Sequence, residues 1–475
     1  MDLFRAPRRL VALLAGGLGL ALPAAERPNV LFIFADDQRA DTIAALGNPV
    51  IKTPNLDRLV ARGVAFERAY MQGGNNGATC VPSRAMLLSA RPLPRIDEKL
   101  SRDETWPHAF GAAGYATFMA GKWHNTPGSV GKSFQQARSL FVGGMTNPLK
   151  AKINDLLPSG KLGPERACPQ HLCAEATDEL LAFLRGHDPA KPFFAYLAFD
   201  GPHDPHVVPE DFPVRYDPAT IPLPANFLPQ HPFDNGEMVI RDEQLLPWPR
   251  TPAAIQAMLA DYYRYISYLD LQVGRVLDAL EASPAGRNTY VVFAADSGVA
   301  RGSHGLIGKQ NLYEHSLRVP LVFTGPGVPA GRRAAGLCYT FDVMPTLGKL
   351  CEVPAPGTSE GREFTAVLAD PSRAARTELV FGYKRVQKAI TDGRWKLIRY
   401  PQVDRTQLFD LQADPFETKD LSARPEHAER VQSMLGKLAA GMKADGDDDP
   451  LTAAKILPAD WKAPTKLPKP GQKGY

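Results

Sequence analysis

The chain has 475 residues and is 44% hydrophobic, which is enough for one large core and a smaller second unit. Its formal net charge is only +4, because 55 basic residues nearly balance 51 acidic ones. No field of one sign dominates, so the composition argues against a nucleic-acid partner. Much of the excess positive charge lies between Trp461 and Tyr475, and residues 446–475 are predicted to form an extended basic tail.

Residues 1–25 have the layout of a secretory signal peptide. Three arginines precede an apolar run from Leu10 to Leu22, and small residues follow at Ala24 and Ala25. The run is too short for a comfortable membrane span, and an uncleaved N-terminal anchor is the alternative. We expect a secreted or periplasmic protein with no stable membrane span after signal removal.

Export would place the cysteines in an oxidising compartment. There are five of them, at positions 80, 168, 173, 338 and 351. Proximity in sequence favours two local pairs, Cys168 with Cys173 and Cys338 with Cys351, although sequence alone does not fix connectivity. Cys80 is then the odd thiol, either functional or simply buried and free.

The larger part of the chain, residues 26–375, alternates predicted strands and helices. The continuous apolar run Asn29 to Ala35 is typical of a strand buried on both faces. The elements expected after it are helices over 54–63, 82–90 and 177–185, a strand over 193–198, a helix over 252–280 and a strand over 290–295. This order predicts an α/β domain with a large, mostly parallel sheet sandwiched by helices.

The pattern changes near residue 375. Leu379 to Tyr383, Gln387 to Thr391 and Trp395 to Tyr400 read as short strands joined by tight turns. A helix over 426–443 is expected to pack on them. Residues 376–445 are therefore predicted to form a small α+β subdomain with an antiparallel sheet.

Polar side chains follow three of the predicted strands directly. Asp36 and Asp37 end the first, Asp296 ends the last, and His203 lies just beyond a third. In open α/β sheets, ligands bind outside the carboxyl ends of the strands. Three carboxylates at one point favour a hard divalent cation such as calcium or magnesium. Ordinary turn and cap aspartates are the alternative interpretation.

Cys80 belongs to the segment Cys80-Val81-Pro82-Ser83-Arg84. Pro82 suits the start of a helix, so Cys80 is expected near its N-terminal pole, which favours negative charge. These residues alone leave open a redox thiol, a nucleophile, or a cysteine at an ordinary helix start.

The Cys-x-Pro-Ser-Arg segment, with the Ala-Met-Leu-Leu run after it, resembles the signature of type I sulfatases, in which the cysteine is oxidised to Cα-formylglycine. Further segments resemble the family in the expected order, namely 27–37, 121–124, 199–205, 296–320, 342–346 and 408–415. The spacing from Asp296 to Lys309 is similar to that of the iduronate-2-sulfatase-like branch. The resemblance covers essentially the whole mature chain.

The resemblance implies an alkaline-phosphatase-like fold and one bound calcium or magnesium ion. The implied ligands are Asp36, Asp37, residue 80, Asp296 and Ser297. Ser297 departs from the family's usual Asn or His, so either direct ligation or a bridging water is open at that position. Ala90, where Gly is more usual, is a second departure.

The resemblance also implies roles for the candidate catalytic residues Cys80, Arg84, Lys122, His124, His203 and Lys309. Hydrated formylglycine at position 80 would attack sulfur, with Arg84 lowering the pKa of the attacking hydroxyl. Lys122 and Lys309 would neutralise the sulfate oxygens, and His203 or Lys309 would protonate the leaving oxygen. His124 would then remove the second hydroxyl proton, so that sulfate leaves and the aldehyde returns. Gln310 and His304 are weaker candidates for lining the site.

The expected function is hydrolysis of a sulfate ester on a sulfated carbohydrate, after maturation by a formylglycine-generating enzyme or an anaerobic maturase. A phosphonate or phosphate ester hydrolase of the same superfamily is one alternative, and a degenerate sulfatase that only binds sulfated glycans is another. The leaving-group pocket is expected from the loops at 72–78, 124–145 and 202–250, where the sequence carries no readable code.

Overall fold

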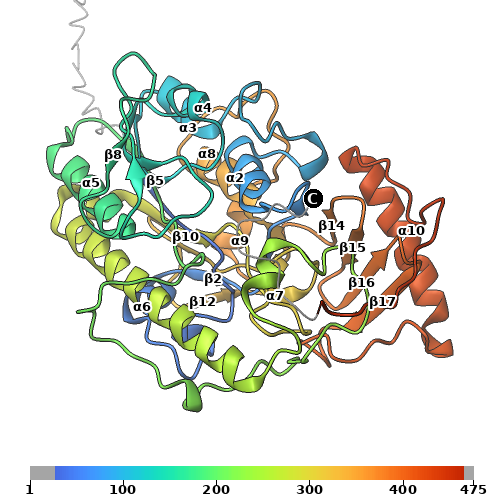
Figure 1. Ribbon diagram of the computed structural model, residues 1–475. Coiled ribbons are helices and arrows are strands. Elements are labelled where there is room, and N and C mark those ends of the chain that lie inside the picture. The colour runs from blue at the N-terminus through green and yellow to red at the C-terminus, as the bar shows by residue number, and fades with distance from the viewer. Residues whose placement is uncertain (1–26, 465–475) are drawn as a thin grey trace, which may run out of the picture.

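The structure is a computed structural model that describes residues 27–464, built around an eight-stranded sheet (Figure 1). In spatial order its strands are β12 (Arg332–Ala334), β2 (Val64–Phe66), β11 (Leu321–Thr324), β10 (Thr289–Ala295), β1 (Asn29–Ala35), β9 (Phe193–Ala198), β5 (Ala116–Lys122) and β6 (Gln136–Phe141). All neighbours pair in parallel except β11, which is antiparallel to β10 and β2. The prediction of a mixed, mostly parallel sheet is confirmed.

The central strands end at the same level. In the register, Ala35 of β1 pairs with Ala295 of β10, and Ala198 of β9 pairs with Gly121 of β5. All seven residues of β1 and all seven of β10 are buried, as their apolar composition requires. The polar residues that follow these strands therefore emerge together at one edge of the sheet.

Helices cover both faces of the sheet. On one face, the side chains of Val30, Phe32 and Phe34 pack with α2 (Cys80–Ser89), α3 (Trp106–Ala112), α4 (Pro127–Ser133) and α8 (Val343–Leu350). On the other face, Leu31 and Ile33 pack with α1 (Pro54–Arg62), α5 (Leu172–Gly186) and α6 (Pro252–Ala282). Two-sided burial explains why these strands are apolar throughout rather than alternating.

Several helix boundaries differ by a few residues from those predicted, and two of the differences have a clear cause. Helix α5 begins at Leu172, five residues before the predicted start, because the His171 ring accepts a hydrogen bond from the Cys173 N–H and caps the helix. Helix α2 begins at Cys80 itself and ends before Ala90, whose φ of 52° is left-handed. That conformation favours glycine, which accounts for the Gly more usual at this position.

A second sheet lies against α10 (Ala428–Asp445), in the order β17 (Arg405–Asp410), β16 (Trp395–Tyr400), β15 (Gln387–Thr391), β14 (Leu379–Tyr383) and β4 (Gly73–Gly74). The four C-terminal strands are antiparallel, and three of them are the predicted ones, whereas β17 was not predicted. The fifth, β4, comes from the catalytic part of the chain, six residues before Cys80, and runs parallel to β14. The subdomain is thus joined to the segment that carries Cys80.

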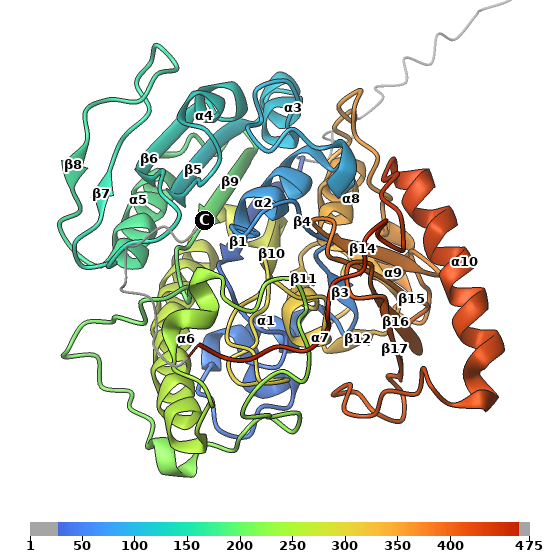
Figure 2. The same cartoon turned by 45° about the vertical axis from the view of Figure 1, so that its right-hand side comes forward.

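The small ladders and the tail complete the fold. Strands β3 (Ala69–Tyr70) and β13 (Cys338–Tyr339) form one ladder, and β7 (Lys152–Ile153) and β8 (Arg166–Ala167) form another. Residues 446–464 run as an extended segment from the C-terminal sheet towards the loop before α6, where Asp234 N–H donates to the carbonyl of Ala459 at 2.8 Å (Figure 2).

The predicted signal peptide, and the tail beyond residue 464, lie outside the described residues. Within residues 27–464, no helix combines the length and the apolarity that a membrane crossing needs.

The two local disulfides expected from sequence are wrong, because all five cysteines are free thiols. The Cys173 thiol faces the Asp200 carboxylate, with Sγ 3.2 Å from Oδ1. The Cys351 thiol at the end of α8 faces the carbonyl of Pro28 at 3.8 Å. Nearness in sequence did not translate into facing side chains.

Candidate active site

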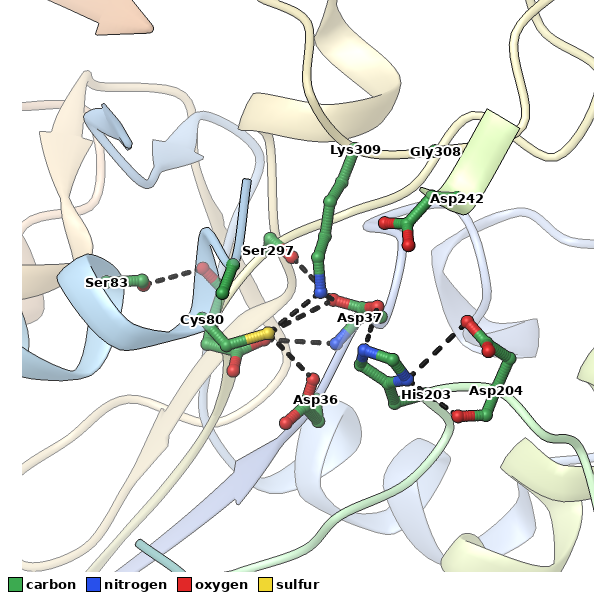
Figure 3. A network of polar contacts seen from close by, with 12 residues as sticks. Asp36, Asp37, Cys80, Ser83, His203, Asp204, Asp242, Ser297, Gly308 and Lys309 are labelled. Carbon is green, nitrogen blue, oxygen red and sulfur yellow. Dashed lines mark hydrogen bonds and ion pairs between the residues drawn. The ribbon is translucent and has the colours of Figure 1, made fainter. Parts of the chain in front are cut away.

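The sheet edge gathers the predicted site residues into one buried cluster (Figure 3). Asp36 and Asp37 follow β1, Asp296 follows β10, and Lys122 is the last residue of β5. Asp36, Lys122 and Asp296 are each 0% exposed. Burial of so many charges requires close pairing, because unpaired ions in a protein interior are costly.

Cys80 lies at the centre of this cluster. Its Sγ is 3.2 Å from Oδ1 of Asp36 and 3.7 Å from Oδ1 of Asp37, and it accepts a hydrogen bond from Lys309 Nζ at 2.8 Å. Burial, followed by the Asp296 and Asp36 charges, raises the pKa of the Cys80 thiol well above its usual value. These neighbours therefore do not activate the thiol itself as a nucleophile.

Arg84, one turn after Cys80 on α2, bridges two of the carboxylates. Its Nη2 lies 3.1 Å from Asp36 Oδ2 and 3.0 Å from Asp296 Oδ2, and its Nη1 donates to the carbonyl of Lys122 at 3.1 Å. The Lys122 ammonium pairs directly with Asp36. Burial alone would raise the pKa of Asp36, but Lys122 and Arg84 hold it well below its usual value.

Lys309 reaches the cluster from the loop between β10 and α7 (Glu314–Leu317). Its Nζ lies 2.6 Å from Asp37 Oδ1 as well as 2.8 Å from Cys80 Sγ. Burial would lower the pKa of Lys309, but the Asp37 and Cys80 charges raise it well above its usual value. The ammonium is therefore held charged, at the atom where the resemblance places the reacting group.

The residues present fit a hard divalent cation. One donor atom from each of Asp36, Asp37, Cys80 and His203 lies within 4.8 Å of the others. Burial and the Asp36 charge raise the pKa of Asp296 to about 6, so a further positive charge would be favourable here. Paired aspartate oxygens are the donors that calcium and magnesium prefer.

Two of the predicted metal ligands are engaged differently. Asp296 accepts the Asp37 N–H through Oδ1 at 3.0 Å and faces Arg84 through Oδ2. The Ser297 hydroxyl donates to Asp37 Oδ1 at 2.8 Å. Ser297 therefore orients an aspartate of the cluster in this structure.

His203 lies at the edge of the cluster, with Nε2 3.5 Å from Asp37 Oδ2 and Nδ1 2.7 Å from the Asp204 carbonyl. Its sequence competitor His206 is partly buried and turned towards Arg301, whose Nη2 lies 3.2 Å from His206 Nε2. Of the two histidines, His203 is thus the one that contacts the aspartates.

His124 follows the end of β5 by two residues. Its backbone is left-handed, with φ of 61°, and its buried Nδ1 has no hydrogen-bond partner among the described residues. Burial and the nearby Lys122 charge lower the pKa of His124 to about 2, so the ring is neutral in this structure.

Sequence reasoning missed Gly144 and Asp242. The Gly144 carbonyl accepts a hydrogen bond from Lys122, and a side chain at this position would place Cβ only 2.7 Å from His124 Nε2. Asp242 lies in η4, a 3-10 helix (Arg241–Leu245), and is drawn beside Lys309 in Figure 3. The Gly143-Gly144 pair was a usable signal, whereas Asp242 had none.

Of the two weaker candidates for lining the site, Gln310 and His304, only one contacts it. Gln310 joins the site, because its Nε2 donates to Asp242 Oδ2 at 2.7 Å and its Oε1 accepts the Lys309 N–H at 3.0 Å. His304 does not, since it stacks on Tyr313 at 3.9 Å and contacts the carbonyl of Glu417.

Comparison with known proteins identifies the family of this chain. The sequence profile of the family described as Sulfatase matches residues 28–353, and that of N-sulphoglucosamine sulphohydrolase, C-terminal, matches residues 302–444. The chain belongs to the sulfatase family, with an alkaline-phosphatase-like fold, and is a sulfuric ester hydrolase.

Similar curated proteins include an N-acetylglucosamine-6-O-sulfatase of Bacteroides thetaiotaomicron, 24% identical, with 91% of this chain and 89% of that protein covered. Iduronate 2-sulfatase of Mus musculus is 28% identical, with 73% and 74% covered. A multifunctional alkaline phosphatase superfamily protein of Trinickia caryophylli is 27% identical, with 86% and 94% covered.

Two solved structures share the fold. One, in complex with its substrate D-glucosamine-2-N,6-O-disulfate, has a TM-score of 0.73 at 21% identity and covers 90% of this chain and 99% of its own. The other, the phosphonate monoester hydrolase of Agrobacterium radiobacter, has a TM-score of 0.69 at 22% identity and covers 88% of this chain and 96% of its own.

Proposed function

We propose that this chain removes sulfate from a sulfated carbohydrate, with Cys80 converted to Cα-formylglycine and one calcium or magnesium ion bound beside it. The observation that carries this proposal is the position of Cys80 Sγ between Asp36, Asp37 and Lys309. A plain thiol has no evident use among buried carboxylates. An oxidised residue 80 would place oxygen there, which suits a hard cation.

Asp36, Asp37 and residue 80 would hold the cation, with Asp296 beside them and Ser297 orienting Asp37. When bound, the cation and the formylglycine together would supply an oxygen nucleophile at residue 80 and positive charge for the sulfate oxygens.

Three basic side chains of the protein would supply the remaining positive charge. Arg84, Lys122 and Lys309 are fixed by Asp36, Asp296 and Asp37 before substrate arrives. Preorganised charges of this kind stabilise a transition state without reorganisation at the moment of reaction. They would bind the tetrahedral sulfate ester anion and counter the charge that develops as the ester bond breaks.

Two histidines would move the protons. His203 is held by the Asp204 carbonyl through Nδ1, so its Nε2 is directed into the site and would donate a proton to the leaving oxygen. His124 lies two residues after Lys122 with a buried Nδ1 that has no partner among the described residues, and this ring would accept the proton released when sulfate departs from residue 80. Separate donor and acceptor residues suit a two-step displacement.

The substrate class rests on the relatives. Several carry names of enzymes that act on carbohydrate sulfates, including the N-acetylglucosamine-6-O-sulfatase and a delta 4,5-hexuronate-2-O-sulfatase. A phosphonate or phosphate ester hydrolase is the second candidate, favoured by the likeness to phosphonate monoester hydrolases. The cluster suits either tetrahedral anion. A protein that only binds sulfated glycans would have no use for Cys80, His124 and His203 together.

Export and maturation complete the proposal. Residues 1–25 would direct the chain to the periplasm or outside the cell, and a formylglycine-generating enzyme or an anaerobic maturase would modify Cys80. The catalytic domain would span residues 26–375 and the C-terminal subdomain 376–445. The strand pairing of β4 with β14 would make the two one unit.

The test compares matched aryl esters with protein produced in a host that modifies Cys80. Turnover of a chromogenic aryl sulfate well above that of the aryl phosphate supports a sulfatase, and the reverse order supports the second candidate. A panel of 6-O- and 2-O-sulfated monosaccharides then assigns the sugar. Fully modified protein that binds these sugars without turnover would overturn the proposal.

A further inference from the structure

Gln310 stands at the junction of three segments around the active site. Its Nε2 donates to the carbonyl of Gly77 at 2.8 Å and to Asp242 Oδ2 at 2.7 Å, while its Oε1 accepts the Lys309 N–H at 3.0 Å. The side chain is 4% exposed. Every polar atom of this amide is therefore used, and each bond leads to a different part of the site.

These segments are the ones that carry the reacting groups. Gly77 lies in the turn that leads into Cys80, and Lys309 is the adjacent residue along the chain. The backbone carbonyl of Gln310 also accepts a hydrogen bond, at 3.2 Å, from Gln387 in β15 of the C-terminal subdomain. Gln310 thus links the turn before residue 80, Lys309 and the subdomain through direct contacts.

The neighbouring turn η4 holds the same loop from its other side. The Glu243 carboxylate, 3% exposed, accepts the N–H groups of Ile307 at 3.0 Å and Gly308 at 2.8 Å, and pairs with buried Arg250 at 2.9 Å. These are the two residues before Lys309. A side chain at Gly308 would place Cβ 2.9 Å from the Asp242 Cβ, so the loop packs directly on η4.

Lys309 needs such support because it is on a loop. The other cations of the site are fixed by a strand end or a helix, whereas Lys309 Nζ must stay within 2.8 Å of Cys80 Sγ without either. Misplacement of a catalytic group by about 1 Å costs about 100-fold in rate. Buried, fully satisfied hydrogen-bond networks provide that rigidity.

We propose that Gln310 is a positioning residue for the reaction, which sets Lys309 and residue 80 relative to each other and is anchored by Asp242 and Glu243 of η4. This inference rests on the proposed sulfatase function. It assigns a role to the loop over 202–250, for which the sequence alone indicated no specific function.

The sharpest variant is Gln310→Glu, which keeps the shape but turns the Nε2 donor into an oxygen that faces Asp242 and the Gly77 carbonyl. With a chromogenic aryl sulfate and modified protein, we expect kcat to fall about 10- to 100-fold with KM nearly unchanged. Gln310→Met, which buries no charge, is expected to lose kcat in the same direction and keeps the test valid if the first variant does not fold.

A double variant separates positioning from general damage. Asp242→Asn combined with Gln310→Glu reverses donor and acceptor while conserving net charge, so the bond between the two side chains returns. We expect the double variant to regain at least about fivefold in kcat over Gln310→Glu alone, the coupling that contacting residues show. The matched control is Gln432→Glu on the exposed side of α10, which should leave kcat and the melting temperature unchanged.

The outcomes distinguish the two proposals. No sulfate ester turnover by modified wild-type protein would remove the proposed function itself. Wild-type turnover with kcat of both Gln310 variants within twofold of wild type would overturn the positioning role. A loss of kcat that simply follows a loss of melting temperature, with no recovery in the double variant, would overturn it as well.

Discussion

The two sides of the active site are built in different ways. On the sulfate side, Asp36, Lys122 and Asp296 lie at the ends of strands of the central sheet or directly after them, so the sheet register sets their spacing. On the loop side, Lys309, which also reaches Cys80, and Asp242 lie on loops, and cross-loop hydrogen bonds through Gln310 set their spacing. The first side is fixed by strand pairing, and the second by side chains that no local pattern announces.

This difference separates chemistry from specificity. Every sulfate ester presents the same anion, and a strand-end cluster of fixed charges is well suited to an unchanging target. Leaving groups differ from one substrate to the next, and loops tolerate change better than strands do. We therefore expect changes on the sulfate side to abolish turnover. Changes on the other side should only lower its rate.

The largest effect is expected from Cys80→Ala, which removes the residue at the centre of the sulfate side. Turnover of an aryl sulfate should fall by at least about 1,000-fold, because loss of a nucleophile removes most of the catalysis. The melting temperature should change by only a few degrees, since one buried sulfur atom is lost. Cys168→Ala, at a buried cysteine away from the site, is the control. Retained activity in the Cys80 variant would contradict the account.

Removal of divalent cations should have the next largest effect. Asp36 and Asp37 offer oxygen donors at one buried point, so a chelator should lower kcat by at least about tenfold, and added calcium or magnesium should restore it. Restoration measured separately with each ion identifies the native one. Undiminished activity in protein shown by elemental analysis to be metal-free would rule out this role.

A smaller effect is expected at the edge between the two sides. Gly144→Ala would bring Cβ to 2.7 Å from His124 Nε2 and displace the ring or the carbonyl that Lys122 contacts. We expect kcat to fall about 10-fold, with the loss mainly in release of sulfate from residue 80. Gly436→Ala in α10, where the added methyl meets nothing within 4 Å, is the matched control. Equal rates in both variants would remove His124 as the base.

The smallest effect is expected at the tail, which supports η4 from outside. Trp461 packs on Trp248 at 5.5 Å between ring centroids, and Arg250 lies over the same Trp248 ring at 4.1 Å. Trp461→Ala should lower stability by about 1–2 kcal/mol, the value of a partly buried aromatic ring, and change kcat less than twofold. A larger loss of kcat than Gln310→Glu shows would mean that the tail, rather than Gln310, sets the position of Lys309.

The sequence was informative about residues whose position is set by the end of a strand or the start of a helix. The apolar run before Asp36, and Pro82 two residues after Cys80, located the sulfate side, because strand ends and helix starts have strong local signatures. The fold class followed from the same alternation. Three strands of the small antiparallel sheet were predicted too, but β17 and β4 were not, and the two glycines of β4 carry no strand signal.

Other features of the site depend on contacts between residues that are distant in sequence, and the local sequence pattern does not predict them. The partner of Ser297 is Asp37, 260 residues away in sequence, which only the fold determines. The same holds for Asp242 and Gln310, because their roles depend on contacts with residues that are distant in sequence or on other loops. The cysteine pairs failed for a related reason, since thiol orientation depends on helix packing rather than on spacing.

The most direct test of the account is the mass of the tryptic peptide that spans residues 69–84, from protein made in a host with the modifying enzyme. The account predicts a loss of about 18 Da at residue 80, the change from cysteine to formylglycine, in the same preparation that turns over an aryl sulfate. An unmodified Cys80 in a preparation that is fully active, with a control sulfatase modified in the same host, would contradict it.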